Sequence, residues 1–167
     1  MVAAISTSVL LHGAAPSSKN KVEEDRAIYR AMGIIDKRLR APGAAMPSSE
    51  DVRTFLRLAL AEEERECVLV MLLDAQLRLI ESRVLFAGSL TCATIHPREV
   101  VKFALQHNAA AAILAHNHPG GTVVPSVEDI EITKVVKEAL GLIDVEMLDH
   151  MIVAQREVVS FVESALI

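Results

Sequence analysis

Two histidines, a serine and an aspartate lie close together in the segment "HNHPGGTVVPSVED", which begins at His116. If the two histidines end a β-strand, the side chains of His116 and His118 point to the same side, and Asn117 points away. Ser126 then caps a helix whose first turn contains Asp129, so that a carboxylate can join the two imidazoles. Two histidines and one aspartate with an open fourth position are the ligand set of a catalytic zinc site.

Taken singly, each of these residues has an ordinary structural explanation. A histidine at a strand end is commonly a surface or hydrogen-bonded residue, and a serine before a helix is usually a cap. An acidic residue in a first turn usually interacts with the helix dipole. The four positions together, at this spacing and in a strand, loop and helix context, favour a metal site over a purely structural explanation.

The sequence on either side predicts the elements that position these residues. Residues 109–116, "AAAAILAH", predict a short apolar strand that ends at the histidines. A second helix is predicted before it, because Pro97 suits a first helical position. The helix capped by Ser126 is predicted to end at Gly141, since glycine commonly terminates helices.

The other strands are predicted from apolar runs. Residues 66–74, "ECVLVMLLD", are typical of a strand buried on both faces, and residues 77–88, "LRLIESRVLFAG", predict its hairpin partner. Residues 145–164, "VEMLDHMIVAQREVVSFVES", predict a final pair of strands. The order of elements indicates an α/β fold with loops at strand ends available for a site.

The length of 167 residues predicts one catalytic or binding domain preceded by an arm. Residues 1–45 are expected to form this arm, with one helix, "KVEEDRAIYRAMGIIDKRLR", and a linker rich in proline, glycine and alanine. Residues 46–167 are expected to form the domain. Its first helix is predicted to begin after Ser48 or Ser49 and to run through "VRTFLRLALAEEE".

Composition limits the possible partners and the setting. The chain contains no run of roughly 18 apolar residues, so no membrane span and a soluble protein are expected. Cys67 and Cys92 form no metal or disulfide pattern, and a secretory signal is not evident, which favours a reducing, cytoplasmic setting. Residues 1–45 carry a net +3 and residues 46–167 a net -8, so the domain is expected to bind nucleic acid weakly or not at all.

Several segments resemble a known family. "HNHPGGTVVPSVED" matches the H-x-H-x7-S-x2-D signature of the JAMM (JAB/MPN+) metalloprotease domains, and "IHPREVVKFAL", "NAAAAILAHNHP" and "LDHMIV" resemble the RadC family, long described as DNA repair proteins. The resemblance covers about residues 48–164. It implies a cytidine-deaminase-like (JAB/MPN) α/β fold, with a mixed sheet flanked by helices. It also implies one zinc ion and a protein or peptide substrate cleaved at an amide or isopeptide bond.

The resemblance also implies roles for individual residues. Glu66 stands where JAMM domains have a glutamate that handles the proton of the metal-bound water, and Ser126 is expected to help stabilise an oxyanion. Asp149, in "LDH", and Asn117 are weaker candidates for supporting the ligands. Asp149 either orients a ligand imidazole through a hydrogen bond or belongs to a buried structural pair with His150.

The chain departs from the family pattern in two places. The family loop typically reads H-N-H-P-S-G, and Gly120 replaces that serine here. Residues 1–45 do not match the helix-hairpin-helix region of long RadC-like proteins, which makes a DNA role less expected. The alternative to a hydrolase is a non-catalytic or DNA-repair-associated accessory protein with a structural zinc, which the basic cluster at the end of the arm helix supports. The sequence does not set the oligomeric state.

Overall fold

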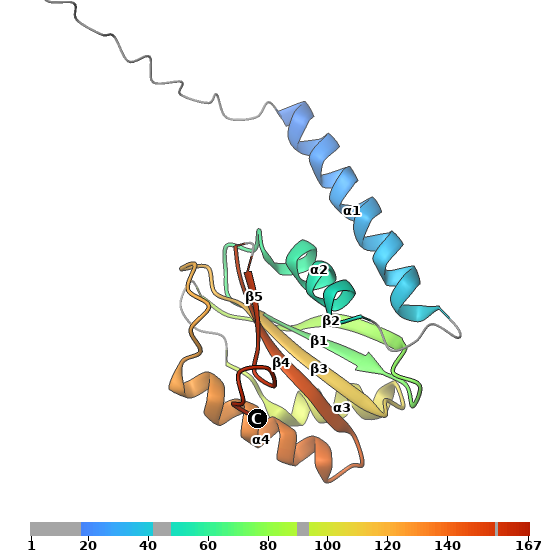
Figure 1. The fold of residues 1–167 in the computed structure, drawn as a ribbon, viewed down its shortest axis with the longest axis vertical. Helices are drawn as coiled ribbons and strands as arrows, with labels where there is room; N and C mark the ends of the chain where they lie inside the picture. Colours follow the sequence, from blue (N-terminus) through green and yellow to red (C-terminus); the bar gives the residue numbers. More distant parts are fainter. Residues whose placement is uncertain (1–17, 42–47, 90–93, 156) are drawn as a thin grey trace, which may run out of the picture.

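A five-stranded mixed sheet lies between two layers of helices in the computed structural model, which describes residues 18–41, 48–89, 94–155 and 157–167. The strands follow one another across the sheet in the order β2-β1-β3-β4-β5. Helices α1 and α2 cover one face, and helices α3 and α4 cover the other (Figure 1). The predicted α/β class, with a mixed sheet flanked by helices, is confirmed.

The strands agree with the apolar runs in the sequence. They are β1 (Cys67–Leu73), β2 (Leu79–Ala87), β3 (Ala111–Asn117), β4 (Glu146–Ala154) and β5 (Glu157–Ser160). Neighbouring strands pair antiparallel except β3 and β4, which are parallel. Every residue of β1 and β3 is buried, as expected of central strands with helices on both faces. The predicted hairpin of β1 with β2 is confirmed.

The helices are α1 (Ser18–Arg40), α2 (Ser49–Leu60), α3 (Pro97–Gln106) and α4 (Val127–Gly141). Three predicted boundaries are confirmed, namely the start of α3 at its proline, the end of α4 at its glycine, and an N-cap serine for α2. The prediction that α2 continues through the acidic triplet is wrong. Glu62, Glu63 and Glu64 follow the helix and are exposed, because no apolar position among them can pack on the sheet.

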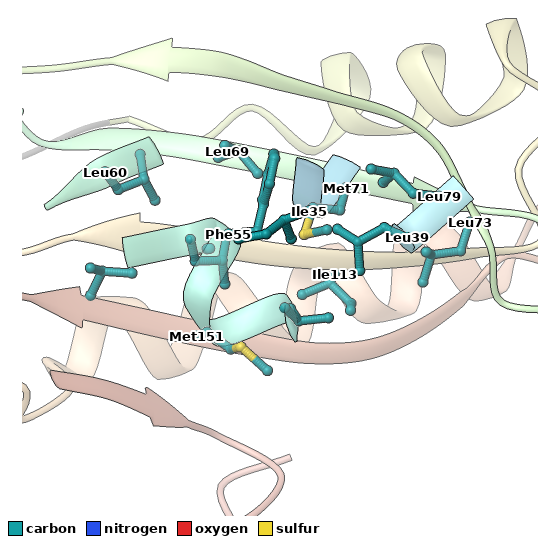
Figure 2. Close-up of a cluster of buried hydrophobic side chains, with 14 of the residues drawn as sticks. Ile35, Leu39, Phe55, Leu60, Leu69, Met71, Leu73, Leu79, Ile113 and Met151 are labelled. Carbon is teal, nitrogen blue, oxygen red and sulfur yellow. The ribbon is translucent and has the colours of Figure 1, made fainter. Parts of the chain in front are cut away.

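Two apolar cores fill the space between the sheet and the helices, because successive strand residues face opposite sides. In β1, Leu69 and Met71 pack under α1 and α2, whereas Val70 and Leu72 pack under α3 and α4. Figure 2 shows the first core, with Phe55 of α2 among its labelled side chains. The sheet is thus fixed on both faces, which makes its strand ends rigid supports for a site.

The C-terminal half of α1 packs on the domain, although the sequence predicted an arm. Ile35 and Leu39 are buried in the first core, 7% and 1% exposed. Arg40 pairs with the carboxylate of Asp36 at 2.8 Å, and its guanidinium also donates to the carbonyl of Ile80 in β2. An amphipathic helix shows which of its positions are apolar but not the surface that they cover.

Two sequence expectations fall on residues that the structure does not describe. The predicted domain boundary lies in residues 42–47, and Cys92 lies in residues 90–93. Cys67 is buried as a free thiol, and burial raises its pKa. Among the described helices, none combines the length and the apolar character needed to cross a lipid bilayer.

Candidate metal centre

Three polar side chains converge where β3 ends and α4 begins. The Nε2 atoms of His116 and His118 are 3.0 Å apart. The carboxylate of Asp129 reaches both rings, with Oδ1 at 3.3 Å from His116 Nε2 and Oδ2 at 3.5 Å from His118 Nε2. The structure therefore brings together the three residues predicted as metal ligands, each with one ligand atom facing the same point.

The geometry of β3 and the following turn explains this convergence. His116 and His118 are two residues apart and lie on the α3/α4 side of the sheet, whereas Asn117 lies on the other. The amide of Gly121 then donates to the carbonyl of His118 at 2.9 Å and closes a turn. Gly121 has a φ of 80°, in the left-handed region that side chains disfavour, and a Cβ there would lie 2.9 Å from Gln155 Nε2.

The N-terminus of α4 places Asp129 through a capping box. The hydroxyl of Ser126 accepts from the amide of Asp129 at 3.0 Å, and Asp129 Oδ2 accepts from the amide of Ser126 at 2.8 Å. The other oxygen, Oδ1, is the one nearer His116. One carboxylate therefore serves both in the capping box and as a candidate ligand.

Each histidine is held through its Nδ1 atom. His118 Nδ1 lies 2.9 Å from the carbonyl of Thr122, and a carbonyl only accepts, so Nδ1 carries the hydrogen. His116 Nδ1 lies 2.8 Å from Nε2 of His150, a fully buried residue of β4. Burial lowers the pKa of His150 well below its ordinary value, so this ring is neutral.

Asp149 does not contact either ligand imidazole, contrary to the first of its two predicted roles. Its Oδ2 accepts from the hydroxyl of Ser160 at 2.6 Å, and its Oδ1 accepts from the amides of His150 and Val162 at 2.8 and 3.2 Å. Adjacent strand residues face opposite sides, so only His150 of this dipeptide can reach His116. Asp149 instead ties β4 to the segment around β5.

Asn117, on the face of the sheet opposite to the two histidines, forms hydrogen bonds with the segment that precedes β1. Its side-chain oxygen accepts from the amide of Cys67 at 2.7 Å, and its side-chain amide donates to the carbonyls of Glu63 and Arg65 at 3.0 and 2.9 Å. These three bonds hold the segment that enters β1. Glu66 lies within that segment, so the residue between the two histidines also sets the path of the chain at Glu66.

Glu66 lies beside the candidate ligands. β1 and β3 pair antiparallel, with Val68 opposite His116, and continuing this register past the strand ends would put Glu66 opposite His118. The main chain of Glu66 is fixed by bonds to Gly88 and Ser89 at 2.8 and 2.9 Å. Its side chain is partly exposed and lines the same cleft as the three candidate ligands.

The cleft in front of the three ligands has a volume of about 730 Å³ and is open to solvent. Its wall includes Glu66, Ser126 and the apolar side chains of Ile95, Val124 and Ile132. Among the described residues that line it, none is a lysine or an arginine.

The electrostatics of the cluster call for a cation at its centre. Burial alone would raise the pKa of Asp129, but the imidazoles of His116 and His118 beside its carboxylate hold it well below its ordinary range. The hydrogen bond with Asp129 raises the pKa of His118. A carboxylate and two imidazole nitrogens at this separation repel one another unless a proton or a metal ion lies between them.

The spacing of the ligand atoms fits zinc. Tetrahedral ligands at 2.0–2.1 Å from a zinc ion are about 3.3–3.4 Å from one another. The separation of the two Nε2 atoms, 3.0 Å, and that of His116 Nε2 from Asp129 Oδ1, 3.3 Å, lie close to that value, whereas the 3.5 Å separation at His118 is to the other carboxylate oxygen, Oδ2. Two histidines and one carboxylate also match the nitrogen and oxygen donors that zinc accepts in catalytic sites.

Comparison with known proteins gives a match over the whole region that holds the site. A family model described as "RadC-like JAB domain" matches residues 46–166. UPF0758 protein YfjY of Escherichia coli K12 is 45% identical over 142 residues, which are 85% of this chain and 89% of that protein. UPF0758 protein YeeS of the same organism is 45% identical over 144 residues, 86% of this chain and 97% of that protein. A UPF0758 protein of Nitrosomonas eutropha is longer, and its 49% identity over 125 residues covers 75% of this chain but 56% of that protein.

Proposed function

Because the chain belongs to the RadC family of JAB domains, we propose that it is a zinc-dependent hydrolase that cleaves an amide or isopeptide bond in a protein or peptide substrate. One observation carries the proposal. Three metal-ligating atoms, from His116, His118 and Asp129, face one point at the wall of an open cleft. A structural site would instead surround its metal with four protein ligands.

The ion would be held by Nε2 of His116, Nε2 of His118 and the carboxylate of Asp129. When bound, zinc lowers the pKa of a water molecule to about 7 and polarises a carbonyl group. The protein contributes ligands whose positions are already fixed, because each imidazole is held through its Nδ1 atom and the carboxylate of Asp129 is held by the amide of Ser126. Little reorganisation is then needed on binding.

Glu66 is the proposed proton carrier. Its carboxylate lines the cleft beside His118 but is not one of the three clustered ligands, so it is available to take a proton from the attacking water and give it to the leaving amine. Ser126 is proposed to donate to the oxygen on which negative charge develops. Its hydroxyl oxygen accepts from the amide of Asp129, which leaves the hydroxyl hydrogen to donate into the cleft.

The charges favour a peptide over nucleic acid as substrate. Residues 46–167 carry a net -8, and phosphate binding depends on clustered lysine and arginine. The basic end of α1 is partly neutralised, because Arg40 pairs with Asp36 at 2.8 Å and Arg38 lies 3.9 Å from Asp51. These contacts weaken the case for a DNA-associated accessory protein.

The test compares metal content and turnover on the same preparations. We expect about one zinc per chain in the wild type and loss of zinc when His116 and His118 are both changed to alanine. We expect Glu66→Gln to keep its zinc, because the amide has the same shape and no ligand is altered. Turnover of a responsive amide or isopeptide substrate should fall by about 10² to 10⁴ in Glu66→Gln, the usual contribution of a general acid–base group.

Three outcomes count against the proposal. Zinc retained by the double histidine variant would mean that the metal binds elsewhere. Loss of zinc from Glu66→Gln would make that residue a ligand. Full turnover by Glu66→Gln with its zinc intact would assign the proton transfer to another group.

A further inference from the structure

A chain of buried hydrogen bonds connects His116 to the main chain of α4. His116 Nδ1 lies 2.8 Å from His150 Nε2, and His150 Nδ1 lies 2.5 Å from the hydroxyl of Thr133. That hydroxyl in turn lies 2.5 Å from the carbonyl oxygen of Asp129. His116 is 1% exposed, and His150 and Thr133 are fully buried, so water does not compete for these bonds.

The last member of the chain fixes the direction of every bond before it. The carbonyl of Asp129 can only accept, so the single hydroxyl hydrogen of Thr133 is donated to it. The hydroxyl oxygen must then accept from Nδ1 of His150. His150 is fully buried and its hydrogen-bond partners, His116 and Thr133, are not acidic, so its ring has one N–H, and its Nε2 carries a lone pair that accepts from Nδ1–H of His116.

We infer that Thr133 and His150 are positioning residues that hold His116 in the tautomer with a free lone pair on Nε2. This inference rests on the metal site proposed above, since Nε2 is the atom that faces Asp129 and His118. A histidine ligand generally donates its other N–H to a fixed partner, which sets both tautomer and ring orientation. Here that partner is an imidazole whose own tautomer is set by Thr133.

The position of His116 in the sheet explains why a relay is needed. His118, just beyond β3, reaches the carbonyl of Thr122 directly. His116 lies inside β3, where it pairs with Val68 of β1 on one side and with Ile152 of β4 on the other. Main-chain groups there are engaged in the sheet, so the acceptor for Nδ1 comes from a side chain of β4.

The relay also links two ligands that lie on different elements. It starts at the side chain of His116 in β3 and ends at the main chain of Asp129 in α4. A shift of α4 along the sheet would break the bond between His150 and Thr133. The relay therefore sets the position of the third ligand relative to the first as well as the tautomer of the first.

Two substitutions of Thr133 separate the hydroxyl from the volume of the side chain. Thr133→Val keeps the shape and removes the donor and the acceptor, whereas Thr133→Ser keeps the hydroxyl. The first readout is the tautomer of His116 in the metal-free protein, by nitrogen-15 NMR of the imidazole. The second is the zinc dissociation constant, measured in competition with a chromophoric chelator.

In the wild type and in Thr133→Ser we expect a single His116 tautomer with hydrogen on Nδ1. In Thr133→Val we expect a mixture of His116 tautomers and zinc binding weaker by about tenfold. This is the lower end of the loss of metal affinity that is typical when a residue hydrogen-bonded to a metal ligand is replaced. If Thr133→Val does not fold, His150→Phe removes the acceptor and keeps an aromatic ring against Phe161, and a mixture of His116 tautomers is expected there too.

The two readouts distinguish failure of the inference from failure of the proposed function. An unchanged tautomer and unchanged zinc affinity in Thr133→Val would overturn the inference. An equal loss of zinc affinity in Thr133→Ser would also overturn it, because the hydroxyl would then not be the group that matters. Absence of zinc binding by the wild type would instead overturn the proposed function, and the tautomer measurement would still decide the relay.

Discussion

Replacement of Asn117 by alanine should destabilise the protein more than removal of a hydrogen-bonded side-chain amide at an exposed position. Asn117 is 3% exposed and makes three hydrogen bonds to the main chain of residues 63–67. Its partner Cys67 is buried, so the amide of Cys67 would lose its acceptor without access to water. The carbonyls of Glu63 and Arg65 belong to exposed residues and can be rehydrated.

The magnitude follows from this difference between the three bonds. An unsatisfied buried amide costs about 1–3 kcal/mol, and each bond whose partner regains water costs about 0.5–1 kcal/mol. The free energy of unfolding of Asn117→Ala should therefore be lower by about 2–5 kcal/mol. With a urea m-value of about 2 kcal/mol/M, the unfolding midpoint should fall by about 1–2.5 M.

The assay is urea unfolding followed by circular dichroism, with Gln76→Ala as the matched control. The side chain of Gln76 also accepts a hydrogen bond, from Arg78 at 3.0 Å, but at an exposed position, so its loss should change stability by less than about 0.5 kcal/mol. At urea concentrations below the unfolding transition, Asn117→Ala should keep its zinc and lose turnover, because the segment that carries Glu66 is no longer held by the side chain of residue 117. A midpoint equal to that of Gln76→Ala would refute the reasoning.

Two further predictions concern the loop and the metal. Gly121→Ala should lower the thermal unfolding midpoint, because the φ of 80° at this position is strained for a residue with a side chain and a Cβ would lie 2.9 Å from Gln155. Gly120→Ser should leave the midpoint unchanged, since nothing lies within 4 Å of a Cβ there. The measurement is calorimetry of both variants, and equal shifts of the two midpoints would contradict the prediction. Removal of metal with a chelator should leave the far-ultraviolet circular dichroism native, and re-addition of zinc at 100 times its dissociation constant should add about 2.7 kcal/mol to the free energy of unfolding. Unfolding on chelation would support a structural metal.

The features that the sequence predicted correctly have local signals. The start of α3 at Pro97, the cap at Ser126 and the end of α4 at Gly141 each depend on the conformational preference of one residue. The grouping of His116 and His118 depends on the two-residue period of a strand. None of these predictions requires knowledge of the contacts between elements.

The features that the sequence missed depend on contacts between distant segments. Thr133 and His150 meet His116 only because β4 lies beside β3 and α4 covers both, and nothing local to either residue indicates this order. The sequence suggests Asp149 as the residue that orients a ligand imidazole, whereas in the structure His150 contacts His116. The sequence does not show which residues of β4 face the site. The packing of Leu39 on the first core was missed for the same reason.

The three candidate ligands share a property that bears on whether the metal is structural or catalytic. The two imidazoles are fixed through an atom other than Nε2, His116 through His150 and His118 through Thr122, and the carboxylate of Asp129 is fixed by the bond from the amide of Ser126 to Oδ2. The elements that carry them are already held by two apolar cores. A metal is therefore not needed to bring β3 and α4 together. A site that the fold builds on its own and leaves open to a cleft costs little to reorganise when a substrate binds, which is the requirement for catalysis and not for structural support.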